Sequence, residues 1–120
     1  HWSGGGYLNA QGTATEVGDV VETSAINLAF GDAARKLPVS SSKGVHGHAM
    51  GAAGAMEFIA SVMALRAGQL PPTAFLVHPD PRCDLDYIPL AAREGKGVRT
   101  VMSNSFAFGG SNAVLIAQAA

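Results

Sequence analysis

The sequence predicts an α/β fold in which a mixed sheet is flanked by helices on one side. Strand-like and helical patterns alternate through the first half of the chain, which favours this class over an all-helical or all-β fold. Two strand-like segments joined by a short glycine-containing turn then close the chain and predict an antiparallel hairpin. The hydrophobic share of 48% in 120 residues supports one packed core, so we expect a single domain without an internal repeat or interdomain linker.

The first elements are the end of a short strand over residues 7–10 and a polar, glycine-containing turn over residues 11–18. Asp19 and Glu22 have the spacing of a capping box and predict the start of a helix. Gly31 is expected to end that helix as its C-cap. The face expected to be buried consists of Val20, Val21, Ala25, Ile26, Leu28 and Ala29.

A brief buried strand over residues 37–40 is expected to lead into a loop at Lys43, and a second helix over residues 51–66 follows. That helix carries apolar residues around its whole circumference, a pattern typical of helices buried on every side. Protein outside these residues is therefore expected to cover its outer face. Gly68 is the expected stop of the helix.

The remaining elements are a connection and the hairpin. Residues 70–84 contain Pro71, Pro72, Pro79 and Pro81, which predicts an extended connection without a helix. Residues 99–105 and 112–118 are the two expected strands, and residues 106–111 turn between them.

Composition restricts the class of protein. The net charge of −1 offers no basic stripe for nucleic acid, and no apolar run is expected to reach the length needed to cross a membrane. One cysteine excludes an internal disulfide framework and fits a reducing compartment. The opening residues 1–6 resemble a cut end or an interior start, so we expect the chain to be a piece of a longer protein.

The most informative chemistry lies where Lys43 and His48 precede the second helix, because backbone N–H groups at a helix start favour developing negative charge. Glu57 lies in the middle of that apolar helix, and a buried carboxylate needs a partner. One interpretation is a buried Lys43–Glu57 pair that fixes the loop carrying His48. The alternative is that Glu57 reaches solvent and Lys43 lies on the surface.

For several other motifs we compare a functional role with a purely structural one. The pair His46 and His48 is compatible with a metal, but a zinc site needs a further ligand, and we expect none. Cys83 is expected to be structural, because neighbouring acidic residues disfavour a thiolate.

Residues 106–111 form either a mobile lid whose amides face an oxyanion or an ordinary hairpin turn with buried phenylalanines. Thr13 and Thr15 either bind an extended ligand or cap the turn before Asp19.

Four motifs together carry a family resemblance: NAQGTATEVGD (residues 9–19), SKGVHGH (42–48), GAAGAME (51–57) and NSFAFGGSN (104–112). In this order they resemble the C-terminal part of a β-ketoacyl-[acyl-carrier-protein] synthase. The nearest type is the elongating KAS II-like condensing enzyme of fatty-acid synthesis and its polyketide relatives. The resemblance implies a thiolase-like fold, a layered αβαβα structure of two similar halves, in which residues 1–120 belong to the C-terminal half.

The resemblance also implies roles for individual residues. His48 is the second catalytic histidine, a donor to the malonyl thioester carbonyl, and Lys43 and Glu57 are its supporting pair. The backbone N–H of Phe108 belongs to the acyl oxyanion hole, and Gln11 occupies the position of the first catalytic histidine. The residues expected to bind substrate are Thr13 and Thr15, as phosphopantetheine contacts, together with Phe106, Gly109 and Gly110.

The implied reaction is a decarboxylative Claisen condensation of an acyl thioester with malonyl-acyl carrier protein. The implied partners are acyl carrier protein, the N-terminal half of the same synthase, and a second subunit in a homodimer or in a heterodimer with a ketosynthase. We expect a cytoplasmic transferase without a metal or bound cofactor. Its substrates are carried on the phosphopantetheine of the carrier protein. Nucleic acid and membrane are not expected partners.

Three departures from the family pattern qualify this interpretation. The nucleophilic cysteine of the family lies upstream of these residues, and Cys83 does not match it. Gln11 donates a hydrogen bond but cannot exchange protons near neutral pH, and it is either natural or engineered. Ala107 replaces a glycine of the gating loop, which restricts the backbone there.

Two other classes of function stay open. One is a non-catalytic, ketosynthase-like partner of the chain-length-factor type, which Gln11 favours and which His48, Lys43 and Glu57 disfavour. The other is a free-standing α/β binding domain, which would cover its own apolar helix.

Overall fold

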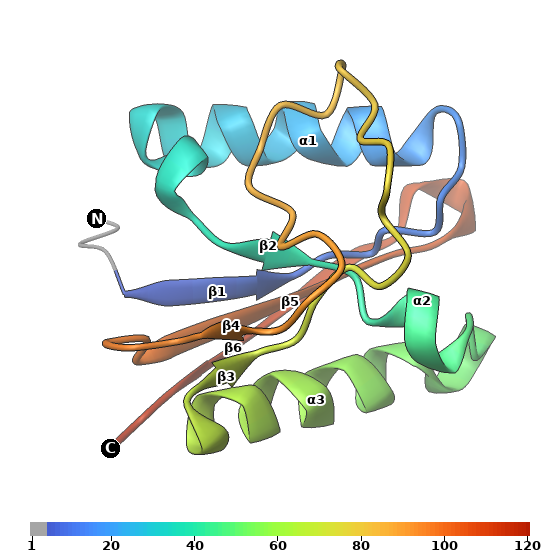
Figure 1. Ribbon diagram of the computed structural model, residues 1–120. Helices are drawn as coiled ribbons and strands as arrows, with labels where there is room; N and C mark the ends of the chain where they lie inside the picture. The colour runs from blue at the N-terminus through green and yellow to red at the C-terminus, as the bar shows by residue number, and fades with distance from the viewer. Residues whose placement is uncertain (1–4) are drawn as a thin grey trace.

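The computed structural model describes residues 5–120 (Figure 1). The chain order matches the predicted succession of strand, helix, strand, helix, connection and hairpin. The elements are β1 (Gly6–Asn9), α1 (Gly18–Phe30), η1 (Gly31–Lys36), β2 (Val39–Ser40), α2 (Lys43–His46), η2 (Met50–Ala52), α3 (Ala53–Ala67), β3 (Gln69–Leu70), β4 (Arg93–Glu94), β5 (Thr100–Phe106), η3 (Phe108–Gly110) and β6 (Asn112–Gln118).

The main sheet is mixed, with strand order β2-β1-β5-β6. β1 runs parallel to both β2 and β5, with Asn9 opposite Ser40 on one side and Ser103 on the other. β6 runs antiparallel to β5 from Phe106↔Asn112 to Thr100↔Gln118, which confirms the hairpin. Because β1, β2 and β5 are parallel, their carboxyl ends share one edge of the sheet, and the loops that carry the quoted motifs leave from there.

The two long helices lie on opposite faces of this sheet (Figure 1). Leu8 packs in a core with Ile26 of α1, whereas its neighbour Tyr7 packs in a second core with Ala64 of α3. Successive side chains of a strand point to opposite faces, so β1 is covered on both sides. The expectation of helices on one side is therefore wrong: the adjacent buried residues Tyr7 and Leu8 are the pattern of a strand between two layers.

Helix α1 buries Ile26 as predicted, but it does not bury the rest of the face that the sequence predicted. Its buried residues are Glu22, Thr23 and Ile26, while Val21 and Leu28 are 59% and 88% exposed. The capping box is also wrong, because the N-cap residue is Val17 and makes no side-chain capping bond. Glu22 faces the sheet edge instead, where its carboxylate binds main-chain N–H groups. The predicted C-cap at Gly31 is confirmed, since its N–H donates to Asn27 O.

Helix α3 presents small and polar residues to the sheet and large apolar residues away from it. Its buried positions are Ala53, Glu57, Ser61 and Ala64. The side chains of Met56, Ile59 and Met63 are 38%, 62% and 54% exposed. The helix begins at Ala53 after the short turn η2 rather than at residue 51. It ends before Gly68, the predicted stop, which has a left-handed conformation. Residues 5–120 therefore cover α3 on one side only.

The expectation that no apolar run reaches membrane-spanning length is corrected. Residues 50–67 are long and apolar enough to cross a membrane by length and composition, with a mean hydropathy of 1.2. Core helices of soluble proteins have the same length and composition. Helix α3 packs against β1 and β5, and the ion-paired Glu57 lies on its sheet-facing side. The run was missed because Glu57 and Ser61 interrupt it in the sequence.

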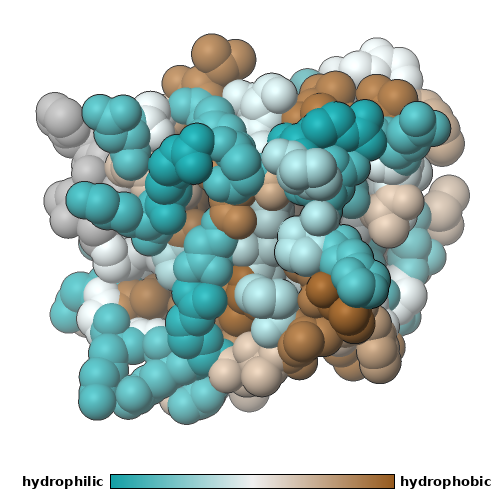
Figure 2. Space-filling model, turned by 45° about the horizontal axis from the view of Figure 1, so that its top comes forward, coloured by the Kyte–Doolittle hydropathy of each residue, from teal (hydrophilic) through white to brown (hydrophobic). Residues whose placement is uncertain are grey.

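The proline-rich connection contains no helix, as predicted, and it rises from the α3 side of the sheet to the α1 side (Figure 1). β3 and β4 form a two-stranded antiparallel sheet. Thr73 accepts from the N–H of Ser41 at 3.2 Å and donates to Tyr87 O at 2.6 Å. On the face shown in Figure 2, hydrophilic residues are mixed with hydrophobic ones in several separate places.

Candidate functional site

The candidate site is an open cavity of about 790 Å³ at the carboxyl edge of the parallel strands. Gln11 reaches it from the end of β1, His48 from the segment between α2 and η2, and Phe106 from the end of β5. Thr13, Thr15 and Phe108 also line it, together with Ser105 and Gly54. The fold thus brings together six residues that the sequence singled out in motifs far apart along the chain.

Glu22 fixes the loop that carries Gln11. Its carboxylate accepts hydrogen bonds from the main-chain N–H groups of Gln11 at 3.0 Å and Gly12 at 3.1 Å. The side-chain amide of Asn104 on β5 donates to the same carboxylate at 3.0 Å. Glu22 is 4% exposed, so these charge-assisted bonds form away from water and hold the loop firmly. Sequence reasoning assigned Glu22 to a helix cap and missed this role.

Gly12 allows this loop to lie against the next strand. Its φ is +37°, and a Cβ built there would lie 2.5 Å from Cβ of Ser41. The Ser41 hydroxyl donates to Gly12 O at 2.8 Å, which holds the two segments together. Only glycine fits both the backbone angle and the close approach.

The two threonine hydroxyls lie together, and one of them is also engaged locally. Thr13 Oγ1 and Thr15 Oγ1 are 3.5 Å apart. Thr15 Oγ1 accepts a hydrogen bond from the N–H of Gly18 at 3.1 Å. Thr15 therefore caps the turn before Asp19, and both threonines face the cavity as well.

Lys43 and Glu57 form a buried ion pair, which confirms the first of the two sequence interpretations. The Lys43 ammonium contacts Glu57 Oε1, and the two side chains are 5% and 0% exposed. The other carboxylate oxygen, Oε2, is buried without a hydrogen-bond partner among residues 5–120. The pair joins α2, the one-turn helix that stands where a loop was expected, to the sheet-facing side of α3.

His48 stands between α2 and η2, immediately ahead of α3. It is exposed among the described residues and lines the cavity together with Gln11. Gly47, which precedes it, has φ 75° and ψ 178°, and its N–H donates to Lys43 O at 2.8 Å. The ion pair below α2 and this capping bond set the place from which His48 enters the cavity.

The turn between β5 and β6 presents Phe108 outward, with 94% of the residue exposed. This overturns the reading of a turn with buried phenylalanines, although Phe106 is half-buried. Phe108 begins the short helix η3, so its N–H has no partner in a preceding turn. Ala107 adopts an extended conformation with φ −131°, which any residue tolerates, and its N–H donates to Ser111 O at 2.8 Å. Gly109 and Gly110 are exposed and do not line the cavity.

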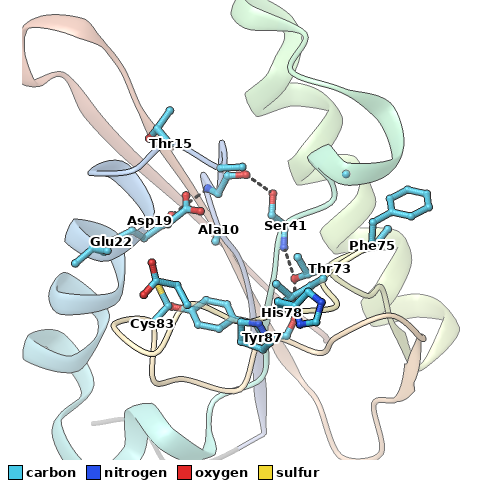
Figure 3. Close-up of a pocket in the computed structure, with 18 of the residues that line it drawn as sticks. Ala10, Thr15, Asp19, Glu22, Ser41, Thr73, Phe75, His78, Cys83 and Tyr87 are labelled. Carbon is cyan, nitrogen blue, oxygen red and sulfur yellow. Dashed lines mark hydrogen bonds between the residues drawn. The ribbon is translucent and has the colours of Figure 1, made fainter.

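A second cavity of about 440 Å³ lies between α1 and the proline-rich connection (Figure 3). It shares Gly12, Thr15, Asp19 and Glu22 with the first cavity. Burial raises the pKa of the Asp19 carboxyl, whose Oδ1 has no hydrogen-bond partner in the described part of the chain. Cys83 lines this cavity and not the first, so it lies apart from His48.

The structure offers no cluster of metal ligands within residues 5–120. No group of three or more His, Cys, Asp or Glu side chains is arranged to hold an ion there. Both nitrogens of His46 are within hydrogen-bond distance of oxygen atoms of its own segment. A metal at His46 and His48 would have to displace one of those contacts.

Besides Glu22, sequence reasoning missed the roles of Asn104 and Asn9. Both lie inside the quoted motifs, but their side chains make contacts across the sheet that chain order does not reveal. Asn9 is fully buried and its amide reaches Ser42 Oγ at 3.3 Å. Their position toward the carboxyl ends of strands could have indicated these roles, because polar side chains line sites there in α/β folds.

A mixed sheet with a helix on each face and this polar edge is the C-terminal part of a thiolase-like fold, and comparison with known proteins agrees. The family described as "Beta-ketoacyl synthase, C-terminal domain" matches residues 6–76. The chain therefore belongs to the β-ketoacyl synthase family, as part of its C-terminal domain.

Individual relatives agree with this assignment. The 3-oxoacyl-[acyl-carrier-protein] synthase 2 of Coxiella burnetii is 54% identical over 110 residues, which are 92% of this chain and 26% of that protein. The structure of the ishigamide ketosynthase/chain length factor has a TM-score of 0.86 at 42% identity and covers 92% of this chain and 27% of its own. A type II polyketide ketosynthase in complex with its acyl-carrier protein, AntDE:AntF, has a TM-score of 0.90 at 34% identity and covers 95% of this chain and 28% of its own. The chain thus spans about a quarter of the length of the relatives it matches.

Proposed function

We propose that the protein is a β-ketoacyl-acyl carrier protein synthase, an acyltransferase of fatty-acid or polyketide synthesis, and that residues 1–120 form most of its C-terminal half. The observation that carries the proposal is the meeting of Gln11, His48 and the Phe106–Phe108 turn on one cavity. The Lys43–Glu57 pair behind the cavity supports it further. The names of the relatives, which include a 3-oxoacyl-[acyl-carrier-protein] synthase, support the same reaction class.

In the proposed reaction an upstream cysteine carries the acyl group as a thioester. The bond between the carboxylate carbon and the α-carbon of the malonyl group breaks, carbon dioxide leaves, and the electron pair stays on the α-carbon as an enolate. His48 donates an N–H to the enolate oxygen, where negative charge develops. The α-carbon then attacks the acyl carbonyl, whose oxygen accepts from the N–H of Phe108, and the cysteine sulfur leaves.

The geometry supports the roles that we propose for the surrounding residues. Thr13 and Thr15 lie at the cavity wall, where their hydroxyls are placed to bind the amide groups of a phosphopantetheine arm. Phe106 closes one side of the cavity, and the exposed Phe108 turn, with Gly109 and Gly110, acts as a flap over it. Lys43 and Glu57 act by holding α2 against α3 beneath His48 and do not touch substrate.

The proposed partners are an upstream half of the same protein, acyl carrier protein and a second ketosynthase-type subunit, in the cytoplasm. The exposed side chains of Met56, Ile59 and Met63 on α3 support the first of these, because a helix apolar on its outer face needs a covering layer. The same exposure counts against a free-standing binding domain. The solved complex of a related ketosynthase with its carrier protein supports the second.

The alternative function is a non-catalytic partner of the chain-length-factor type, and Gln11 is the observation that favours it. An amide at this position retains a hydrogen-bond donor but provides no acid or base near neutral pH. A related solved structure pairs a ketosynthase with a chain length factor. The residue at the upstream nucleophile position separates the two functions, because cysteine favours catalysis and an inert residue favours the partner role.

The direct test is an assay of the full-length protein with malonyl-acyl carrier protein, alone and with an acyl-acyl carrier protein. We expect release of carbon dioxide and formation of a β-ketoacyl product, and a decrease of roughly 10²–10³-fold in the His48→Ala variant. The His78→Ala variant is the matched control, since His78 is an exposed imidazole outside the site. A folded protein that performs neither reaction would reject the enzymatic proposal.

A further inference from the structure

His46 is the other histidine of the SKGVHGH motif, and the proposed function gives it no role. It is the last residue of α2, two positions before His48, and it is half-buried. Its Nδ1 lies 2.7 Å from Gly47 O and its Nε2 lies 2.9 Å from Ser42 Oγ. The ring therefore bridges the start of α2 and the peptide bond that joins Gly47 to His48.

For a neutral ring, the chemistry of these partners fixes the position of the ring proton. A carbonyl oxygen only accepts, so the contact with Gly47 O requires a proton on Nδ1. In the neutral ring Nε2 then accepts, and the Ser42 hydroxyl donates to it. Ser42 Oγ in turn accepts from the side-chain amide of Asn9 at 3.3 Å, and that amide also reaches the main-chain oxygen of Glu57 at 3.5 Å.

The bridged peptide has little else to hold it. Gly47 has a left-handed φ of 75°, and no atom lies within 4 Å of a Cβ built on it, so packing does not restrain this residue. Glycine is also the residue with the greatest backbone freedom. Two hydrogen bonds restrain it: its own N–H donates to Lys43 O, and its carbonyl accepts from His46.

We propose that His46 is a positioning residue: as the neutral Nδ1–H tautomer, it fixes the Gly47–His48 peptide and thereby aims the His48 ring into the cavity. The hydrogen-bonded series from Glu57 O through Asn9 and Ser42 to His46 ties this orientation to helix α3. The inference rests on the proposed function only for its effect on catalysis. The tautomer and the orientation of His48 are independent of it.

The kinetic test compares the full-length protein with its His46→Ala and His46→Asn variants. The asparagine amide nitrogen falls near the place of imidazole Nδ1 and is able to donate to Gly47 O. We expect His46→Ala to lower kcat for malonyl decarboxylation by roughly 10- to 100-fold with little change in KM, because a small misplacement of a catalytic donor is costly. The His46→Asn variant should recover most of the rate, and His78→Ala should match the wild type. An unchanged kcat in His46→Ala would overturn the proposal.

The spectroscopic test needs no activity. In protein labelled with ¹⁵N-histidine, the resonances lost in His46→Asn identify His46, and we expect them to show a protonated Nδ1 and an unprotonated Nε2. The His48 ring resonances should shift or broaden in His46→Ala and stay near their wild-type positions in His46→Asn. An Nε2–H tautomer of His46, or His48 ring resonances that stay unchanged in both variants, would refute the positioning role. If the wild type proves inactive, these signals still decide the inference while the proposed function fails.

Discussion

The Lys43 ammonium meets the Glu57 carboxylate at a point where neither side chain is more than 5% exposed. Glu57 lies on the face of α3 that packs on the sheet, and Lys43 begins the one-turn helix α2. Desolvation of two charges is costly, and their attraction repays it only when both partners are present. The pair therefore fixes the position of α2 against α3, and with it the position of the peptide that joins α2 to His48.

The first prediction concerns this pair. Glu57→Gln and Lys43→Met should each lower the free energy of unfolding by about 3–5 kcal/mol, because each leaves one buried charge uncompensated. The Lys43→Met/Glu57→Gln double variant should be more stable than the sum of the two single changes predicts, since it removes both charges. Urea unfolding of the full-length protein measures these differences.

The control for the pair is the surface ion pair of Asp80 with Arg82, at 2.7 Å. Arg82→Ala should leave the urea midpoint unchanged, because exposed pairs contribute little to stability. Single variants of Lys43 or Glu57 that behave like Arg82→Ala would show that the buried contact is not needed for stability.

The second prediction concerns the loop that carries Gln11. Glu22→Gln places an amide NH₂ among three donors: the N–H groups of Gln11 and Gly12 and the Asn104 amide. At least one donor then loses its acceptor, so we expect a loss of about 1–3 kcal/mol in the free energy of unfolding. Hydrogen exchange should show faster exchange at the Gln11 and Gly12 amides. The matched control is Glu16→Gln, which changes an exposed residue. Unchanged exchange rates at the Gln11 and Gly12 amides in Glu22→Gln would show that Glu22 does not hold this loop.

The third prediction concerns alkaline pH. Burial raises the pKa of Tyr87 to about 12. Thr23 donates its proton to Asp19 O at 2.8 Å, so the Tyr87 hydroxyl is the donor in its contact with Thr23 Oγ1, and a phenolate would lose that bond. The unfolded chain releases its phenolic proton first, near the ordinary pKa of about 10, so the free energy of unfolding should fall as pH rises from about 10 to about 12.

Tyr87→Phe tests this pH dependence. The variant should lose about 1 kcal/mol of stability at pH 7 with the missing hydrogen bond, yet decline less steeply than the wild type above pH 10. Urea midpoints between pH 8 and 12 measure both effects. Parallel curves for the two proteins above pH 10 would show that Tyr87 does not carry the alkaline transition.

The sequence was sufficient for the order of elements because local signals mark it. Gly31 and Gly68 end their helices where predicted, and the hairpin follows from two apolar segments around a glycine turn. The placement of the helices was predicted wrongly because it depends on which face of β1 each helix covers. Tyr7 and Leu8 are adjacent and both fully buried, a pattern that indicates two covered faces only when the strand is known to be complete.

The site was predictable only in part, for a similar reason. The Lys43–Glu57 pair follows from the rule that a carboxylate inside an apolar helix needs a cation, and a cation lies nearby in sequence. The partners of Glu22 do not follow, because Asn104 is far away along the chain and meets Glu22 only through the pairing of β1 with β5. Likewise, Asp19 and Glu22 satisfy a capping-box spacing, but tertiary contacts with the Gln11 loop take the place of the local cap.

The last prediction concerns Gln11, which lies at the cavity on the loop held by Glu22. If the family's imidazole at this position acts as an acid or base, Gln11→His should raise malonyl decarboxylation or condensation by roughly 10²–10⁴-fold and should introduce a pH dependence near the ordinary imidazole pKa of about 6.5. If a hydrogen-bond donor is sufficient, Gln11→His should change the rate little, whereas Gln11→Ala should lower it. Rates of the three proteins measured from pH 5.5 to 8.5 separate these cases. Equal rates for Gln11, His and Ala at this position would mean that the residue takes no part in the reaction, and the partner role would then be the better account of the protein.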